Sequence, residues 1–242
     1  GLPLHDRNFA IRYTSNIPRQ VGLAGSSAII VATLRALMEF YGVEIPREVQ
    51  PSLVLSVETG ELGITAGLQD RVIQVYGGVV MMDFSRERTR CVQGYECGHY
   101  ESLEAAGLPP LYVAYSTDAG EPTEVFHNRL RERFDDGDQD VVQAMTRFAD
   151  LALEAFEVLQ SGETGRLHRI LDENYDTRSA ICNLPTEHAD MVSAARSTGA
   201  SAKFAGSGGA IIGTFRDEKM YQRLVDELGA IGCRVLKPVV TS

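Results

Sequence analysis

A loop rich in glycine and serine that runs directly into a long helical pattern is the most constraining feature of this sequence. Residues 18–28 read PRQVGLAGSSA, and the apolar residues of segment 26–41 then recur at the spacing of one helix face. The preceding segment 9–15 alternates apolar and polar side chains, which predicts a half-buried strand. A loop between a strand and a helix N-terminus turns backbone N–H groups toward one point, where the helix end favours an anion. The pattern therefore predicts a phosphate site.

A simpler interpretation of the same loop stays open. Ser26 is a residue type that caps helices, and Gly22 and Gly25 are suited to shaping a turn without any ligand. A Walker loop is excluded, because no Lys-Ser or Lys-Thr pair follows the glycines.

The remaining pattern indicates an α+β chain in two lobes, residues 1–90 and 108–242. Segment 85–108 is polar and lacks periodicity, so we expect a surface excursion and the lobe boundary there. Helices are expected over residues 47–59, from about 69 to Gly77, and over 125–134, 141–160, 165–175 and 219–229. Strands are expected over residues 79–84, 111–115, 210–215 and 234–240.

The charge balance excludes some partners. The chain has 23 Lys and Arg against 33 Asp and Glu, a formal net charge of −10. This charge would repel nucleic acid and anionic membranes, although a helix terminus with Mg²⁺ can still bind a small anionic nucleotide. No apolar run approaches the roughly 20 residues that span a bilayer. We expect a cytoplasmic or plastid-type compartment, with no nucleic acid or membrane partner.

Two ordered motifs resemble signatures of the GHMP kinases, which phosphorylate small metabolites. The loop at 18–28 resembles their second signature, and the string AKFAGSGGA at residues 202–210 resembles their glycine-rich third signature. The resemblance implies ATP bound by Gly22, Leu23, Ala24, Gly25, Ser26, Ser27, Ala28, Gly206, Ser207 and Gly208. It also implies a ribosomal-protein-S5-like N-terminal lobe, incomplete here, and a ferredoxin-like C-terminal lobe.

The resemblance further implies a reaction centre around Asp70, which follows the turn at Gly67. In such kinases this aspartate acts beside the substrate hydroxyl, as a base or as an electrostatic partner. Phosphoryl transfer also needs Mg²⁺ on hard oxygen ligands, for which Ser27 and Glu58 are the candidates. Glu61 is a close rival of Glu58, and Asp70 has the simpler alternative of a helix-dipole partner.

The string AGLQDRVIQVYGGVVMMDFS at residues 66–85 resembles the glucuronokinase branch of that family. This resemblance implies phosphoryl transfer from ATP to the anomeric hydroxyl of D-glucuronic acid, giving D-glucuronic acid 1-phosphate. Arg71 is then the candidate for the sugar carboxylate, unless it only pairs with Asp70. Tyr76 is a second candidate for sugar contact, unless it is a core residue.

Other functions stay open. The enzyme could act on a galactose- or heptose-type sugar, because side chains outside the motifs decide the substrate. Residues 1–15 do not resemble the first GHMP signature, so the isolated chain could instead be a binding module without catalysis. Lys203 and the polar group of Asn174, Asp176 and Arg178 are further candidates for contact with phosphate or substrate.

Overall fold

The computed structural model describes residues 8–18, 21–63, 66–117 and 124–240, with the backbone alone for 124–129. Contacts divide the chain into two compact units. Unit 1 contains Ala24–Leu103 together with the described residues 8–17, and unit 2 contains Pro18–Leu23 and Glu104–Val240. The lobes expected over residues 1–90 and 108–242 stay a prediction.

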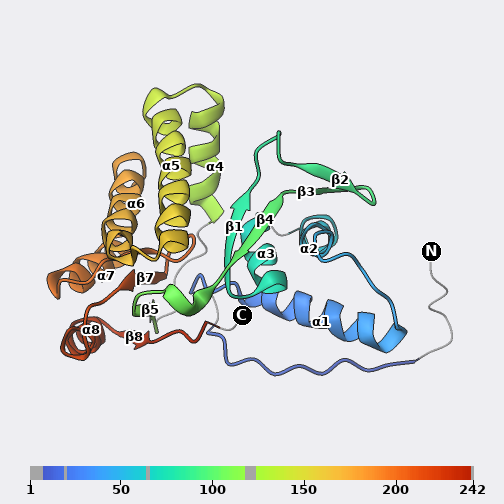
Figure 1. Cartoon of the computed structure of the whole chain (residues 1–242), viewed down its shortest axis with the longest axis horizontal. Coiled ribbons are helices and arrows are strands. Elements are labelled where there is room, and N and C mark those ends of the chain that lie inside the picture. Colours follow the sequence, from blue (N-terminus) through green and yellow to red (C-terminus); the bar gives the residue numbers. More distant parts are fainter. Residues whose placement is uncertain (1–7, 19–20, 64–65, 118–123, 241–242) are drawn as a thin grey trace. The chain divides into compact units, whose positions relative to one another are not determined.

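Unit 1 is built on three helices that bury valines against one another (Figure 1). Val31, Val54 and Val75 each come from a different helix, and each is at most 4% exposed. Gly77 follows the third helix with φ 64°, a left-handed value that glycine adopts without strain. The structure confirms all three predicted helices, which are α1 (Gly25–Tyr41), α2 (Gln50–Gly60) and α3 (Leu68–Tyr76).

The segment after α3 forms short antiparallel strands, which the sequence did not predict within the surface excursion expected over residues 85–108. One pair joins β1 to β4, and a hairpin joins β2 to β3. Ser52 Oγ on α2 donates to the carbonyl of Glu96 at 2.6 Å and holds the hairpin to the helices. Strands this short leave too few alternations to detect in the sequence. They are β1 (Val79–Asp83), β2 (Arg90–Val92), β3 (Tyr95–Cys97) and β4 (His99–Leu103).

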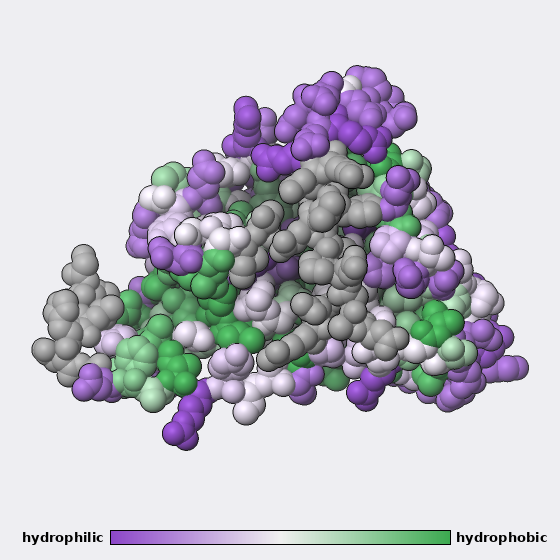
Figure 2. Space-filling view, turned by 180° about the vertical axis from the view of Figure 1, so that it is seen from behind, coloured by the Kyte–Doolittle hydropathy of each residue, from purple (hydrophilic) through white to green (hydrophobic). Residues whose placement is uncertain are grey.

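Residues 9–15 form no strand, which corrects the prediction from their alternating pattern. The side chains of Phe9, Ile11 and Tyr13 are 49%, 47% and 64% exposed, and no described strand pairs with this segment. Alternation is not sufficient, because extended backbone needs a neighbouring strand to satisfy its polar groups. The Phe9 ring instead lies 5.6 Å from that of Phe40, and apolar side chains gather on the surface over α1 (Figure 2).

Unit 2 is centred on a four-stranded antiparallel sheet with the order β6-β7-β5-β8. Gly213 lies within it, where a Cβ would approach the carbonyl oxygen of Ser201 to 1.8 Å. Along the chain, helices lie between the first and second strands of this sheet and between its third and fourth strands. This is the β-α-β-β-α-β order of the predicted ferredoxin-like lobe, and the α+β class is confirmed. The strands are β5 (Leu111–Ser116), β6 (Lys203–Phe204), β7 (Ala210–Thr214) and β8 (Cys233–Leu236).

Helices cover this sheet and bury its core. Tyr112, Ile211, Leu224 and Leu228 are fully buried in one cluster between the sheet, α7 and α8. Helix α5 runs beside both α4 and α6 (Figure 1). The sequence did not predict α7 or β6. No helix in the described ranges is long and apolar enough to cross a membrane. The helices are α4 (Glu124–Asp135), α5 (Gln139–Ser161), α6 (Leu167–Ile181), α7 (Thr186–Ser197) and α8 (Glu218–Ala230).

Candidate active site

Two glycine-containing loops meet within unit 2. A Cβ on Gly22 would lie 2.3 Å from the carbonyl oxygen of Gly208, and one on Gly209 would lie 3.3 Å from the backbone of Val21. Gly22 and Gly209 also have φ values of 72° and 76°, which favour glycine. The backbones of the two loops therefore touch directly, without side chains between them. Both loops were predicted from the sequence, and the structure brings them together.

We expect Gly22→Ala to lower the free energy of unfolding by about 1–3 kcal/mol. The new Cβ would overlap the Gly208 carbonyl, which is backbone and cannot move aside cheaply. Urea unfolding measures the effect. Gly229→Ala in α8 is the matched control, because nothing lies within 4 Å of its Cβ position and helical alanine is stabilising. Equal stability of the two variants would contradict the direct backbone contact.

The side chain of Arg178 holds the loop that joins β6 to β7. Its Nη1 donates to the carbonyl of Gly206 at 2.8 Å, and its Nη2 donates to the carbonyl of Ser207 at 2.9 Å. The guanidinium carbon lies 5.0 Å from the centre of the Phe204 ring, a cation–π arrangement. Arg178 thus contacts the loop through two consecutive peptide groups.

Two further basic side chains lie beside this loop. Lys203 Nζ donates to the carbonyl of Phe204 at 2.7 Å, and burial together with the charge of Arg178 lowers its pKa to about 8. His188 Nδ1 would lie 2.6 Å from a Cβ on Gly208. This nitrogen is buried and has no hydrogen-bond partner among the described residues, and burial lowers the pKa of His188. Lys203 and Arg178 concentrate positive charge at the loop, which favours an anionic ligand.

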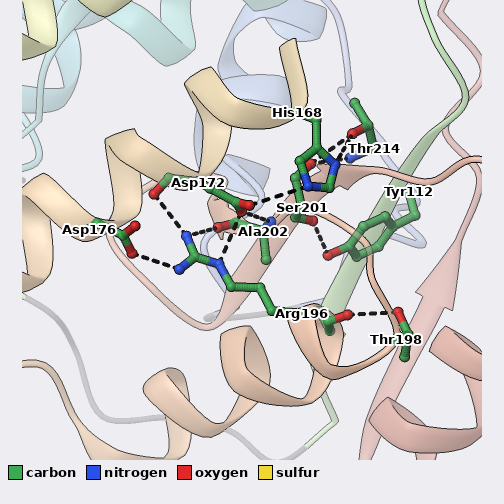
Figure 3. Close-up of polar contacts among 10 residues, drawn as sticks. Tyr112, His168, Asp172, Asp176, Arg196, Thr198, Ser201, Ala202 and Thr214 are labelled. Atoms are coloured by element: carbon green, nitrogen blue, oxygen red, sulfur yellow. Dashed lines mark hydrogen bonds and ion pairs between the residues drawn. The ribbon is translucent and has the colours of Figure 1, made fainter. Parts of the chain in front are cut away.

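An ion-pair network anchors the chain just before the loop (Figure 3). Arg196 on α7 pairs with Asp176 at 2.6 Å and with Asp172 at 3.0 Å, both on α6. Asp172 also accepts from the backbone N–H of Ala202 at 2.9 Å. The strand that leads into the glycine-rich loop is therefore fixed to two helices. Sequence reasoning missed Arg196 and Asp172, because their spacing matches no motif.

Helix α1 in unit 1 begins without a side-chain cap. Its N-cap residue Ala24 is left-handed, with φ 53°, a conformation uncommon for a residue with a Cβ and concentrated at functional sites. Ser26 does not cap the helix and instead donates to Glu58 Oε1 at 3.3 Å. No described side chain therefore satisfies the first N–H groups of α1, as expected for an anion-binding helix end.

A buried ion pair links α2 to α3. Arg71 Nε lies 2.5 Å from Glu58 Oε2, and the two side chains are 5% and 0% exposed. Arg71 Nη1 also donates to the carbonyl of Gly67 at 3.0 Å and lies 3.5 Å from Asp70 Oδ2. The Asp70 side chain is 53% exposed, so it is accessible to a ligand. The main ion-pair partner of Arg71 is thus Glu58, whereas the sequence analysis considered Asp70 as its ion-pair partner.

The two predicted metal ligands differ in how well they fit a cation. Ser27 is 1% exposed and its Oγ has no hydrogen-bond partner in the described part of the chain, so this hydroxyl is free to coordinate. The carboxylate of Glu58 is already balanced by Arg71. Glu61 is exposed at the end of α2. Across the residues described, no three His, Cys, Asp or Glu side chains form a metal cluster.

Tyr76 lies at the end of α3 and packs against two neighbours. Its ring is 5.3 Å from that of Tyr100, and the guanidinium of Arg47 lies 4.4 Å from its centre. Burial raises the pKa of Tyr76. These contacts are those of a packed side chain, and the role of Tyr76 toward a sugar stays a prediction.

Comparison with known proteins identifies the family. Residues 2–78 match the model of the GHMP kinases N-terminal domain. The chain is 44% identical over 218 residues to Probable glucuronokinase 2 of Arabidopsis thaliana, covering 88% of this chain and 58% of the relative. It is 41% identical over 218 residues to Glucuronokinase 1 of the same organism, covering 87% and 58%. The similarity of this chain is thus to the GHMP kinase family. It spans about 58% of the length of these curated relatives.

Solved structures agree with this GHMP kinase fold. The Leishmania major mevalonate kinase in complex with R-mevalonate has a TM-score of 0.68 at 21% identity, covering 90% of this chain and 67% of that one. The Lactococcus lactis galactokinase complexed with galactose has a TM-score of 0.69 at 15% identity, covering 93% and 68%. At these identities the likeness concerns the fold alone.

The predicted site residues fall into two groups, one in each unit. Unit 2 contains Gly22 and the loop of Gly206, Ser207 and Gly208, and Leu23 packs beside Val21. Unit 1 contains the start of α1, where the N–H of Ala28 bonds the carbonyl of Ala24 and Gly25 lies beside Ile17. It also contains the cluster of Ser26, Glu58, Arg71 and Asp70.

Proposed function

We propose that the protein containing this chain is an ATP-dependent sugar-1-kinase. It would transfer the γ-phosphoryl group to the anomeric hydroxyl of D-glucuronic acid and release D-glucuronic acid 1-phosphate. The observation that carries the proposal is the identity to two glucuronokinases over nearly the whole chain. The glycine-rich loops and the exposed carboxylate of Asp70 supply groups that such a reaction needs.

The loops are suited to the phosphate groups of ATP. In unit 2, the backbones of Gly22 and of Gly206–Gly208 run without bulky side chains beside the charges of Arg178 and Lys203. In unit 1, the uncapped N–H groups of α1 and the positive end of its dipole favour negative charge. Each unit thus offers backbone donors to anionic oxygens, and phosphoryl transfer depends mainly on positioning and charge stabilisation.

Asp70 is the proposed acceptor for the proton of the attacking hydroxyl. Its carboxylate lies in the first turn of α3, where the N–H groups of the helix end favour a negative charge. About half of the side chain is exposed to solvent, so a sugar hydroxyl can reach it. Arg71 Nη1 lies 3.5 Å from its Oδ2. A positioned carboxylate of this kind serves as general base or electrostatic partner.

For Mg²⁺, Ser27 fits the proposal better than Glu58. The buried hydroxyl of Ser27 lacks a partner among the described residues, whereas Glu58 would first have to release Arg71. A bound Mg²⁺ would neutralise charge on the phosphate oxygens of ATP. Among the described residues, Ser27 would hold the ion through its hydroxyl.

Arg71 stays the proposed contact for the sugar carboxylate, through one nitrogen rather than a fork. Its Nε bonds Glu58 and its Nη1 bonds Gly67, while its Nη2 has no hydrogen bond to the described residues. A carboxylate on the sugar would pair with this nitrogen. A neutral sugar would leave this nitrogen without a carboxylate partner and would lose a charge-assisted hydrogen bond.

We expect kcat/KM for D-glucuronic acid to exceed that for glucose by about 10²-fold or more, because a site that pairs a charged group rejects the analogue that lacks it. The test uses the full-length natural protein and measures ATP consumption with glucuronic acid, galacturonic acid, glucose, galactose and a heptose. A preference for a neutral sugar would refute the glucuronokinase assignment. Absence of ATP consumption with every sugar would favour a binding module.

A further inference from the structure

Arg178 in the last turns of α6 has a role that the motifs do not assign. Its guanidinium donates to the carbonyls of Gly206 and Ser207 at 2.8 and 2.9 Å, which are two consecutive peptide groups of the glycine-rich loop. Its guanidinium carbon lies 5.0 Å from the centre of the Phe204 ring, so the ring packs against the guanidinium. Arginine is the side chain whose rigid donors match such a pair of acceptors.

These two hydrogen bonds determine where the loop's N–H groups point. In a trans peptide group the carbonyl and the N–H lie on opposite sides, and the described residues contain no cis peptide bond. The carbonyl of Gly206 shares its peptide group with the N–H of Ser207, and the carbonyl of Ser207 shares its own with the N–H of Gly208. With both carbonyls turned toward Arg178, both N–H groups turn away from it.

The loop is held at two further points. The N–H of Ala205 bonds the carbonyl of Ala210 at 3.0 Å and closes the loop at its base. His188 lies against Gly208, where any side chain would collide with it. The loop is thus held at its base, on its carbonyl side and beside Gly208, and Arg178 supplies the side-chain hydrogen bonds to the carbonyls of Gly206 and Ser207.

We propose that Arg178 is a positioning residue that presents the N–H groups of Ser207 and Gly208 to the phosphate chain of ATP. The proposal deepens the proposed function and rests on it. Arg178 does not touch the anion. It binds the carbonyl side of the loop, so its positive charge and its geometry both prepare the amide side for negative oxygens.

The test measures the dissociation constant of ATP by calorimetry, without sugar, on the full-length natural protein. We expect Arg178→Met to weaken ATP binding by about tenfold or more, because two charge-assisted hydrogen bonds that orient the loop are lost. Arg178→Lys keeps the charge but not the fork, so we expect an intermediate loss. Affinity for D-glucuronic acid, measured separately, is expected to stay unchanged.

Arg169→Met is the matched control on the same helix, since Arg169 pairs with Glu154 and Glu173 rather than with the loop. It is expected to bind ATP as the wild type does. Wild-type ATP affinity in folded Arg178→Lys or Arg178→Met would overturn the inference. Loss of glucuronate binding with ATP binding intact would assign the loop to the sugar carboxylate instead.

The outcomes also separate this inference from the proposed function. A wild type that binds ATP but phosphorylates no sugar would refute the proposed function and leave the Arg178 comparison valid. A wild type that binds no nucleotide would overturn the inference itself. Circular dichroism verifies folding, and if Arg178→Met does not fold, Arg178→Lys decides the result.

Discussion

Replacing Asp70 by Asn is expected to lower kcat by about 10²–10⁴-fold, the range that a positioned acid or base contributes. Asn has the same shape but cannot accept the proton of the attacking hydroxyl. The Asp70 side chain is half exposed, and among the described residues its one ion pair is the 3.5 Å contact to Arg71, so we expect the variant to fold. We also expect ATP affinity to stay unchanged, because the substitution does not alter the loops proposed to bind phosphate.

Steady-state kinetics with D-glucuronic acid, together with calorimetric ATP binding, measure both parts of this result. Asp83→Asn is the matched control, because it removes a carboxylate of the same unit whose partners are Ser85 and Arg88. Its turnover should stay near that of the wild type. If Asp70→Asn also turned over normally, Asp70 would be only a partner of the α3 dipole.

Breaking the buried pair between Glu58 and Arg71 is expected to be the most destabilising change in unit 1. Either Glu58→Gln or Arg71→Met leaves one charge buried without its partner, which typically lowers the free energy of unfolding by about 3–5 kcal/mol. Both side chains are almost inaccessible to water, so solvent cannot replace the lost partner. Urea unfolding of each variant measures the loss.

The double variant Glu58→Gln with Arg71→Met separates the energetic effect of the lost ion pair from that of altered side-chain packing. Because a buried pair replaced by neutral residues often costs little, we expect it to recover most of the lost stability. Arg169→Met, which breaks exposed ion pairs, should lower the free energy by at most about 1 kcal/mol. If the single variants lost no more free energy of unfolding than this control, the ion pair between Arg71 and Glu58 would not stabilise the fold.

Local signals predicted much of the fold. The helix α1 and the strands β5 and β7 follow from periodicity and glycine stops, because their burial is encoded within each element. Helix α7 was missed because it follows Pro185 with mixed polar and apolar residues, so only its packing against the sheet reveals it. The strand predicted over residues 9–15 is absent because an alternating pattern does not show whether a neighbouring strand is available for pairing.

The sequence predicted the residues of the candidate site better than it predicted the contacts between them. The motifs named Glu58, Asp70 and Arg71, and all three lie in one cluster. Which carboxylate would pair with Arg71 depended on how α2 packs on α3, and spacing along the chain does not encode that packing. The contact of Arg178 with the glycine-rich loop likewise arises from tertiary structure.

The contact between Gly22 and Gly208 also constrains when this protein can become functional during its synthesis. Residues 18–23 belong to unit 2, although the whole of Ala24–Leu103 separates them from the rest of that unit. The ribosome therefore releases Gly22 long before its partner exists, and such non-local contacts form late in folding. A nascent chain that ends before β7 carries the first loop without its counterpart. Any nucleotide binding that needs both loops must then wait until β7 has emerged.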